Sequence, residues 1–123
     1  MAIKLLIVDD SEPILASLRG LLRCIAGISR IDEATTLAEA VQSVLRDAPD
    51  LMILDLHLPD GLATQVIGRL KQLAPNMGIA VLTLHAEQGY RQKCLALGAD
   101  WFFDKTRECE DLLAVVRQYA ALH

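Results

Sequence analysis

Residues 3–10 of the chain read IKLLIVDD, an apolar run of strand length that stops at two adjacent aspartates. The run is nearly continuous in apolar residues, which is typical of a strand covered on both faces. Residues 51–55, LMILD, repeat the arrangement with four apolar residues followed by Asp55. Strands covered on both faces belong to parallel sheets with helices on either side. These two segments therefore predict an α/β fold.

Helical patterns separate strand-like segments along the rest of the chain. Apolar residues recur at helical spacing between Ile14 and Ile25, and residues 36–39, TLAE, have the spacing of a capping box that begins a second helix. Gly98 is placed to end a fourth helix as its C′ residue. The other expected helices cover residues 62–73 and 112–119, and the other expected strands cover residues 30–33, 79–82 and 101–103. The complete pattern is (βα)5.

The expected topology is a flavodoxin-like, doubly wound parallel sheet with strand order 2-1-3-4-5, because right-handed crossovers leave few other arrangements. In such sheets, functional residues gather at the carboxyl ends of the strands, beside the switch in order between the first and third strands. In this chain, polar residues lie at or just after the carboxyl ends of the expected strands. They are Asp9 and Asp10, Asp55, Thr83, and Lys105.

The composition of the chain favours a single domain and argues against nucleic-acid binding and a membrane span. A chain of 123 residues, 53% of them hydrophobic and 23% charged, suits one domain over residues 1–123. The net charge is −4 with scattered basic residues, so we expect no direct contact with nucleic acid. No apolar run approaches the ~20 residues of a membrane helix. Three widely spaced cysteines without metal-ligand spacing fit reduced thiols and a cytoplasmic location.

The aspartates predict a metal site. Three carboxylates at one sheet edge repel one another, and oxygen ligands suit Mg²⁺. An Asp-Asp pair by itself is equally typical of a solvated loop. Here, however, an acid pair, an isolated aspartate, a hydroxyl residue and a lysine all fall at the carboxyl ends of successive strands in one sheet. Such a combination is improbable by chance. We therefore expect Mg²⁺ at Asp9, Asp10 and Asp55.

Taken together, these motifs resemble the receiver domain of two-component response regulators, and the resemblance covers residues 3 to 121. Its specificity lies in the combination of motifs rather than in any one of them. The matching segments are Val8-Asp9-Asp10, residues 55–61 (DLHLPDG), Leu82-Thr83, Gly98-Ala99-Asp100, and Phe102 with Lys105.

The resemblance implies a role for each polar residue at the sheet edge. Asp55 would be the phosphoacceptor. Asp10, Asp55 and the backbone carbonyl of His57 would coordinate Mg²⁺, and Asp9 would assist through a water molecule. The chain would then be a signalling switch rather than an enzyme, catalysing only its own phosphorylation and dephosphorylation.

The resemblance also implies which residues respond to the phosphoryl group and which surface binds partners. Thr83 and Lys105 would contact the phosphoryl oxygens, and Phe102 would be the aromatic switch. The phosphoryl donor would be a sensor histidine kinase or a phosphotransfer protein. The helix that ends at Gly98, the strand at 101–103 and the last helix would bind an effector or a second copy. All five aromatic residues lie in the last third of the chain, so Trp101 is expected to contribute to that surface.

Several positions depart from the usual pattern of the family. Thr106 follows the lysine where proline is usual, and we expect a trans peptide there because a cis bond without proline costs ~2.5–4 kcal/mol. Leu84 replaces a small residue and is expected to narrow access to Asp55. His57 and His85 occupy positions that vary in the family, and both are expected to influence the lifetime of the phosphoryl group.

Three other functions are compatible with parts of the same pattern. A phosphatase or mutase of the haloacid-dehalogenase type needs a second aspartate two residues after its nucleophile, where this chain has His57. A flavodoxin needs a phosphate loop rich in hydroxyls and glycine after the first strand, whereas residues 9–13, DDSEP, would repel phosphate. A phosphorylation-independent interaction module on the same fold is the third alternative.

Overall fold

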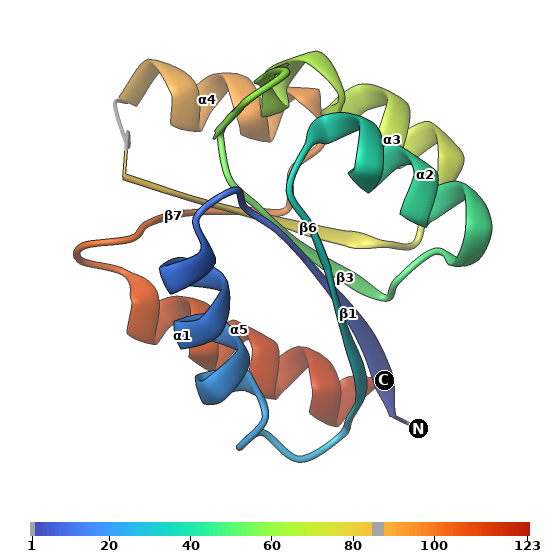
Figure 1. The fold of residues 1–123 in the computed structure, drawn as a ribbon, viewed down its shortest axis with the longest axis vertical. Helices are drawn as coiled ribbons and strands as arrows, with labels where there is room; N and C mark the ends of the chain where they lie inside the picture. Colours follow the sequence, from blue (N-terminus) through green and yellow to red (C-terminus); the bar gives the residue numbers. More distant parts are fainter. Residues whose placement is uncertain (1, 85–87) are drawn as a thin grey trace.

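The computed structural model describes residues 2–84 and 88–123. Its centre is a parallel sheet of five strands in the order β2-β1-β3-β6-β7 (Figure 1). The strands are β1 (Ile3–Val8), β2 (Ile28–Ala34), β3 (Leu51–Leu54), β6 (Gly78–Thr83) and β7 (Trp101–Asp104). The remaining strands, β4 (His57–Leu58) and β5 (Gly61–Leu62), form a separate antiparallel hairpin. The predicted order 2-1-3-4-5 and the flavodoxin-like α/β fold are therefore confirmed.

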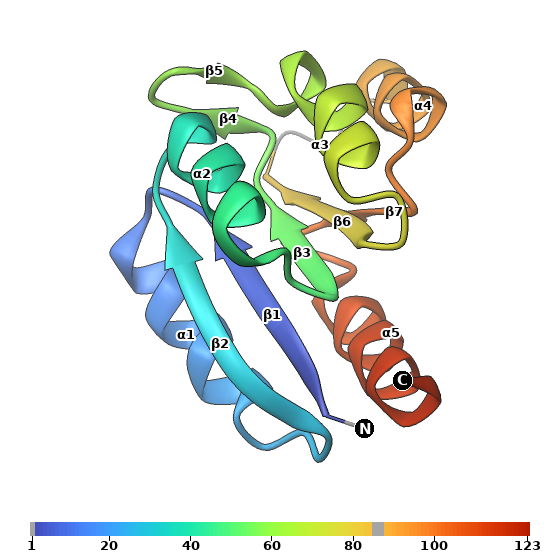
Figure 2. The ribbon, with the colours of Figure 1, turned by 90° about the vertical axis from the view of Figure 1, so that its right-hand side faces the viewer.

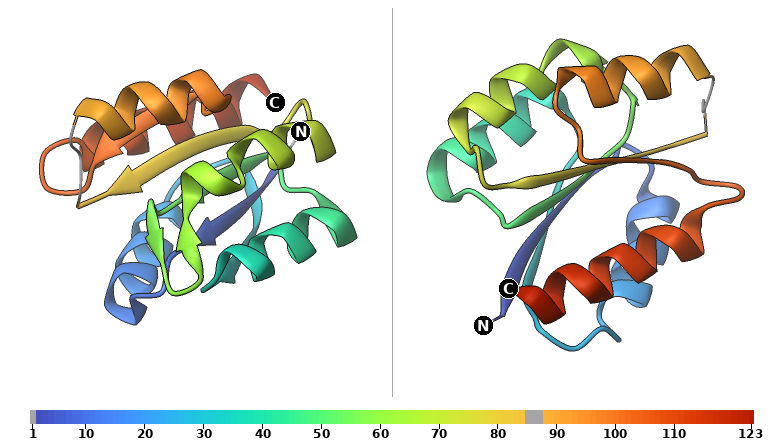
Figure 3. Two further views of the ribbon diagram at one scale, coloured as in Figure 1. Left: turned by 90° about the horizontal axis from the view of Figure 1, so that it is seen from above. Right: turned by 180° about the vertical axis from the view of Figure 1, so that it is seen from behind.

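Helices cover both faces of the sheet. One face carries α1 (Glu12–Leu22) and α5 (Cys109–Leu122), and the other carries α2 (Leu37–Asp47), α3 (Ile67–Leu73) and α4 (Gln88–Leu97) (Figures 1 and 2). The start of β1 and the end of α5 lie near each other in all views, at the amino edge of the sheet (Figure 3). No helix in the described part of the chain is long and apolar enough to span a membrane.

The strands divide the apolar side chains between two cores. Leu6 and Val8 of β1 belong to the core beneath α2, α3 and α4, whereas Leu5 and Ile7 belong to the core beneath α1 and α5. All four are at most 1% exposed. Side chains alternate between the faces of a strand, so a strand between two cores must be apolar at nearly every position. This arrangement explains the continuous apolar runs of the sequence.

Two predicted helix boundaries are wrong. The first helix ends at Leu22 rather than near Ile25, although Ile25 is buried in the turn that leads to β2. The helix predicted over residues 62–73 begins at Ile67 and is preceded by a 3-10 turn at residues 63–65. Before that turn the chain forms the β4–β5 hairpin, where Gly61 has φ 144° (Figure 2). Few residues other than glycine adopt such a φ, which explains the turn.

Thr36 caps the start of α2 as predicted, but Glu39 reaches back to the residue before the N-cap and not to the N-cap itself. The Thr36 hydroxyl accepts the Glu39 N–H at 3.1 Å, while the Glu39 carboxylate accepts the N–H of Thr35 at 2.7 Å. The Asp60 carboxylate, from the hairpin, accepts the N–H groups of the first two residues of α2 at 2.9 and 3.0 Å. A carboxylate at a helix N-terminus is favourable because it satisfies unpaired donors. Asp60 thereby ties the hairpin after β3 to α2.

Gly98 ends α4 as predicted. Its φ is 121°, and the following Ala99 N–H donates to the Cys94 carbonyl at 3.0 Å. A left-handed C′ glycine lets the chain turn back so that the last carbonyls of the helix are satisfied. The turn delivers the chain to β7, whose end reaches the same sheet edge as Asp55.

Gly78 at the start of β6 tests how closely the sheet packs. A Cβ at this position would lie 2.9 Å from a Leu51 methyl carbon and 3.2 Å from the Trp101 ring. We expect Gly78→Ala to lower the free energy of unfolding by about 1–3 kcal/mol. Gly20→Ala, in an open position of α1, should raise it by about 0.5–1 kcal/mol. Chemical denaturation measures both, and equal effects would contradict the packing described here.

Candidate functional site

Three aspartates meet at the carboxyl edge of the sheet. Asp9 and Asp10 follow β1, and Asp55 follows β3, which is the neighbour of β1. The Asp55 N–H donates to the Val8 carbonyl at 2.9 Å, so the ladder between the two strands continues into the site. One carboxylate oxygen from each aspartate lies within 4.8 Å of the others. The predicted acidic cluster therefore forms where parallel strand ends bring it together.

The two buried carboxylates are held in a similar way. Asp9 is 3% exposed and Asp55 is 9% exposed. Asp55 Oδ1 accepts the N–H of Leu56 at 2.8 Å, and Asp9 Oδ1 accepts the N–H of Ser11 at 2.9 Å. Each carboxylate thus has one oxygen fixed by the backbone that follows it. The second oxygen of each faces Lys105.

Lys105 supplies the cation of the site. Its Nζ lies 2.7 Å from Asp9 Oδ2 and 3.4 Å from Asp55 Oδ2, and its side chain is only 9% exposed. Burial raises the pKa of Asp55, because a charged carboxylate loses hydration there; Lys105 opposes that rise, and the Asp9 carboxylate adds to it. Lys105 is therefore the strongest of the influences that lower the pKa of the Asp55 carboxyl against the effect of burial.

The charges of the cluster do not balance. Asp10 is exposed and, among the described residues, forms no ion pair with a lysine, arginine or histidine. Three carboxylates and one ammonium leave two negative charges at the site. Their closely spaced oxygens are hard ligands of the type that Mg²⁺ and Ca²⁺ bind. The arrangement can therefore hold a divalent cation.

Thr83 and Phe102 flank this cluster on the neighbouring strands. Thr83 ends β6, is completely buried, and its carbonyl accepts the Lys105 N–H at 2.9 Å. Phe102 of β7 is 3% exposed and packs on the side of the sheet covered by α4. The sequence predicted Thr83 at this edge, and the family resemblance implied Phe102 as the aromatic switch. The structure places Thr83 directly beside the backbone of Lys105 and places Phe102 in the core beneath α2, α3 and α4.

The other predicted positions are His57, Leu84, His85 and Thr106. His57 begins β4, and its ring packs edge-on against Tyr90 with centroids 5.8 Å apart. Leu84 is 59% exposed, and His85 lies outside the described residues. The described residues contain no cis peptide, so the expected trans bond between Lys105 and Thr106 is confirmed.

Asp60 is a residue whose role the sequence did not reveal. It lies in the turn between β4 and β5. Its carboxylate also caps α2, whose first residue is 23 positions earlier. An aspartate after proline is typical of turns and caps alike, and the distant partner is visible only once the chain is folded. The cap stabilises the β4–β5 hairpin, which begins at His57.

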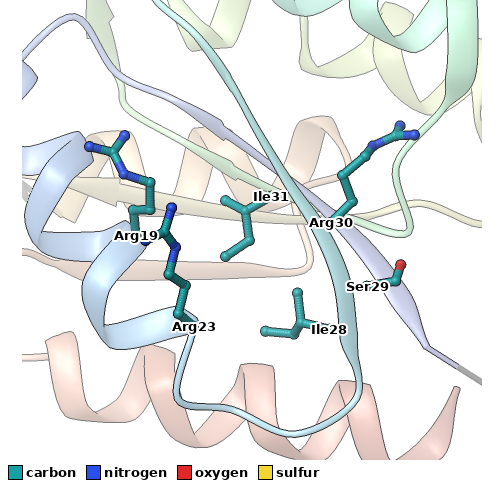
Figure 4. Close-up of a pocket in the computed structure, with 6 residues that line it drawn as sticks. All are labelled: Arg19, Arg23, Ile28, Ser29, Arg30 and Ile31. Atoms are coloured by element: carbon teal, nitrogen blue, oxygen red, sulfur yellow. The ribbon is translucent and has the colours of Figure 1, made fainter.

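A pocket between α1 and β2 lies apart from this cluster. It has a volume of about 240 Å³, and Figure 4 shows Arg19 of α1 and Arg23, which directly follows α1, opposite Ile28 and Ile31 of β2. Arg30 extends from the other side of the strand. Nearby carboxylates already pair with Arg19 and Arg30. We assign no chemistry to this pocket, because it shares no residue with the strand ends that hold the acidic cluster.

Comparison with known proteins identifies the family. The family model described as "Response regulator receiver domain" matches residues 5–117. The chain belongs to this family. The receiver is thus a module of two-component response regulators, and the haloacid-dehalogenase and flavodoxin alternatives are set aside.

Individual relatives are similar to this chain in sequence and in structure, in agreement with the family model. A protein of Pseudomonas aeruginosa is 38% identical over 120 residues, which cover 96% of the receiver and 56% of that protein. A CheY-like receiver domain protein from Methanospirillum hungatei has a TM-score of 0.87 at 26% identity, covering 98% of this chain and 95% of the other. A response regulator from Burkholderia pseudomallei, solved with a phosphorylated aspartic acid, calcium ion and citrate, has a TM-score of 0.81 at 28% identity, covering 96% and 68%.

The receiver spans about half the length of the curated relatives that it matches. The covered share is 56% of the Pseudomonas protein and 53% of the response regulator UvrY of Escherichia coli, which is 26% identical over 115 residues. The similarity therefore concerns the receiver and not the remainder of those proteins.

The buried ion pairs of the receiver can be tested by removing their cation. Lys105→Met leaves the carboxylates of Asp9 and Asp55 buried without a counter-charge, so we expect the free energy of unfolding to fall by about 3–5 kcal/mol. Lys4→Met removes the more exposed pair with Asp47 and should change it by less than about 1 kcal/mol. Denaturant unfolding without divalent cations measures both variants. A Lys105 variant as stable as the Lys4 variant would show that the buried lysine does not hold the cluster together.

Proposed function

We propose that this receiver accepts a phosphoryl group on Asp55 in a Mg²⁺-dependent step, and that residues 1–123 act as one phosphoacceptor domain. The donor is the phosphohistidine of a sensor histidine kinase or of a phosphotransfer protein. The observation that carries the proposal is the setting of Asp55. Its carboxylate follows β3, faces a buried lysine, and lies beside two further carboxylates whose charge is only partly balanced.

The transfer step follows from this setting. A carboxylate oxygen of Asp55 attacks phosphorus, and the bond from phosphorus to the donor nitrogen breaks, leaving its electron pair on the histidine. Such a transition state carries negative charge on the phosphoryl oxygens and on the leaving group. The Lys105 ammonium, 3.4 Å from Asp55 before transfer, is placed to stabilise that charge. The Thr83 hydroxyl is proposed to contact a phosphoryl oxygen beside it.

The acidic cluster fits the metal that the family implies. Asp10, Asp55 and the backbone carbonyl of His57 would hold Mg²⁺, and Asp9 would contribute through a water molecule. The fit rests on three carboxylate oxygens within 4.8 Å of one another and on their excess negative charge. Bound Mg²⁺ supplies the positive charge that lets an anionic donor approach three carboxylates. The calcium ion in the Burkholderia structure supports a divalent site in a related protein.

The output surface is proposed to comprise α4, β7 and α5. Phe102 would change position when Thr83 engages the phosphoryl group, and the surface would then bind an effector or a second copy of the receiver. Trp101 is half-buried and packs edge-on against Tyr119 with centroids 6.0 Å apart. Only part of the aromatic cluster is therefore available for contact. A receiver-type dimer has been solved for NtrC4, which is 29% identical.

The central test is uptake of a phosphoryl group from acetyl phosphate. Wild-type protein with Mg²⁺ should be labelled on one residue, because the metal neutralises the donor. Asp55→Asn should remove the labelling, and excess chelator should remove it from the wild type. Mass spectrometry of the intact protein and of its peptides measures both.

A control variant excludes a general effect of losing one carboxylate. Asp32→Asn removes an exposed aspartate of β2 and should leave labelling unchanged. Labelling of Asp55→Asn at the wild-type level would overturn the proposal. It would favour the phosphorylation-independent interaction module, the alternative that keeps the fold without the chemistry.

A second test concerns the metal site alone. Asp10→Asn removes one of three mutually repelling charges, so without divalent cations the variant should unfold about 3–5 °C higher than the wild type, equal to roughly 1 kcal/mol. Added Mg²⁺ should raise the unfolding temperature of the wild type but not of Asp10→Asn. Calorimetry measures both. Equal Mg²⁺ stabilisation of the two proteins would remove Asp10 from the metal site.

A further inference from the structure

The turn that carries Lys105 is closed by side-chain hydrogen bonds. Asp104 Oδ1 accepts both the N–H and the hydroxyl of Thr106, at 2.8 and 2.6 Å. The Asp104 carbonyl accepts the N–H of Glu108 at 2.8 Å. The turn contains no proline and all its peptides are trans. Hydrogen bonds centred on Asp104 therefore define the path of the chain on both sides of Lys105.

Glu108 connects this turn to α4. Its Oε1 accepts the N–H of Asp104 at 3.0 Å and Nη2 of Arg91 at 2.7 Å. The same guanidinium donates through Nη1 to the Phe102 carbonyl at 2.8 Å and lies 5.0 Å from the centroid of the Phe102 ring. Arg91 is thus fixed by three contacts. A planar guanidinium held in this way orients the carboxylate that it binds.

The contacts of Glu108 with Asp104 and Arg91 can influence the position of Lys105, because Lys105 directly follows Asp104. The backbone N–H of Lys105 is held by the Thr83 carbonyl, but the four-carbon side chain must still direct Nζ to Asp9 and Asp55. A flexible side chain reaches a fixed target only if its Cα is well placed. Glu108 fixes the N–H of the residue before the lysine.

We propose that Glu108, oriented by Arg91, is a positioning residue that places the Lys105 ammonium at the Asp55 carboxylate for phosphoryl transfer. This inference rests on the proposed function of Asp55. In the described part of the chain, the Glu108 carboxylate has no hydrogen bond or ion pair with Asp9, Asp10 or Asp55; its partners are Arg91 and the Asp104 N–H. Without its carboxylate, the Asp104 N–H and one arm of Arg91 lose their shared acceptor, and the end of β7 gains freedom immediately before Lys105.

The kinetic test is a double-mutant cycle with acetyl phosphate as donor. Glu108→Ala should slow phosphorylation about tenfold, since small displacements of a charge-stabilising group are costly to rate. Lys105→Ala should slow it by about a hundredfold. Adding Glu108→Ala to Lys105→Ala should change the rate by less than about twofold, because the group being positioned is already absent.

Two variants separate positioning from stability. Glu108→Gln keeps an acceptor for the Asp104 N–H while losing the charge for Arg91, so its rate should lie between those of wild type and Glu108→Ala. Asp47→Ala removes a carboxylate that also binds two cationic side chains, those of Lys4 and Arg30, at the opposite edge of the sheet. Because its ion pairs are exposed, this variant should change stability little and should leave the phosphorylation rate unchanged.

Two kinetic outcomes would overturn the proposal. One is a wild-type phosphorylation rate for Glu108→Ala, whatever loss of stability accompanies it. The other is an equal slowing by Glu108→Ala in the presence and absence of Lys105, which would mean that Glu108 acts by another route.

The failure of the proposed function is recognised separately. Asp55→Asn labelled like the wild type would reject the phosphoacceptor itself, and with it the role of Glu108 in transfer. The placement of the lysine has its own readout in a crystal structure of Glu108→Ala. Lys105 Nζ beyond 4 Å from the Asp9 carboxylate would support positioning by Glu108. An unchanged Lys105 would overturn it.

Discussion

The burial of one ammonium between two carboxylates is the constraint on which the rest of the molecule depends. Lys105 comes from the end of β7, an edge strand, and Asp9 and Asp55 come from β1 and β3 in the interior of the sheet. Buried charges are tolerated only when they are paired and hydrogen-bonded. Because the strands are parallel, all three residues lie at one edge of the sheet. The buried charges can pair only in this topology.

Most of the fold could be predicted from the sequence because its strands lie between two cores. Residues such as Leu6 and Ile7 face opposite cores, which makes the strands apolar without interruption and easy to separate from helices. The wrong helix boundaries occur where the spacing of apolar residues and the preferences of turn residues favour different structures. Ile25 continues a helical spacing but is buried in a turn, and the segment at residues 57–62 pairs as a hairpin that was expected to be loop and helix.

The site was predictable for a related reason. Residues that end successive parallel strands must meet, so Asp9, Asp55 and Lys105 could be grouped without coordinates. Residues that act through side-chain contacts across the sequence could not. Arg91 and Glu108 are separated by 17 positions, and nothing in their local sequence distinguishes them from solvated surface charges. Their partnership depends on how α4 packs over β7, which the spacing of apolar residues does not specify.

The other edge strand, β2, has a consequence for how the receiver behaves in a crowded solution. An exposed strand edge offers unpaired backbone groups on which another chain can extend the sheet and begin to aggregate. On β2, Arg30 bridges Asp32 and Asp47 at 2.7 and 2.8 Å. An incoming strand would have to desolvate these charges along its length. The ion pairs of β2 therefore protect the molecule from edge-to-edge polymerisation while contributing little to the stability of the fold itself.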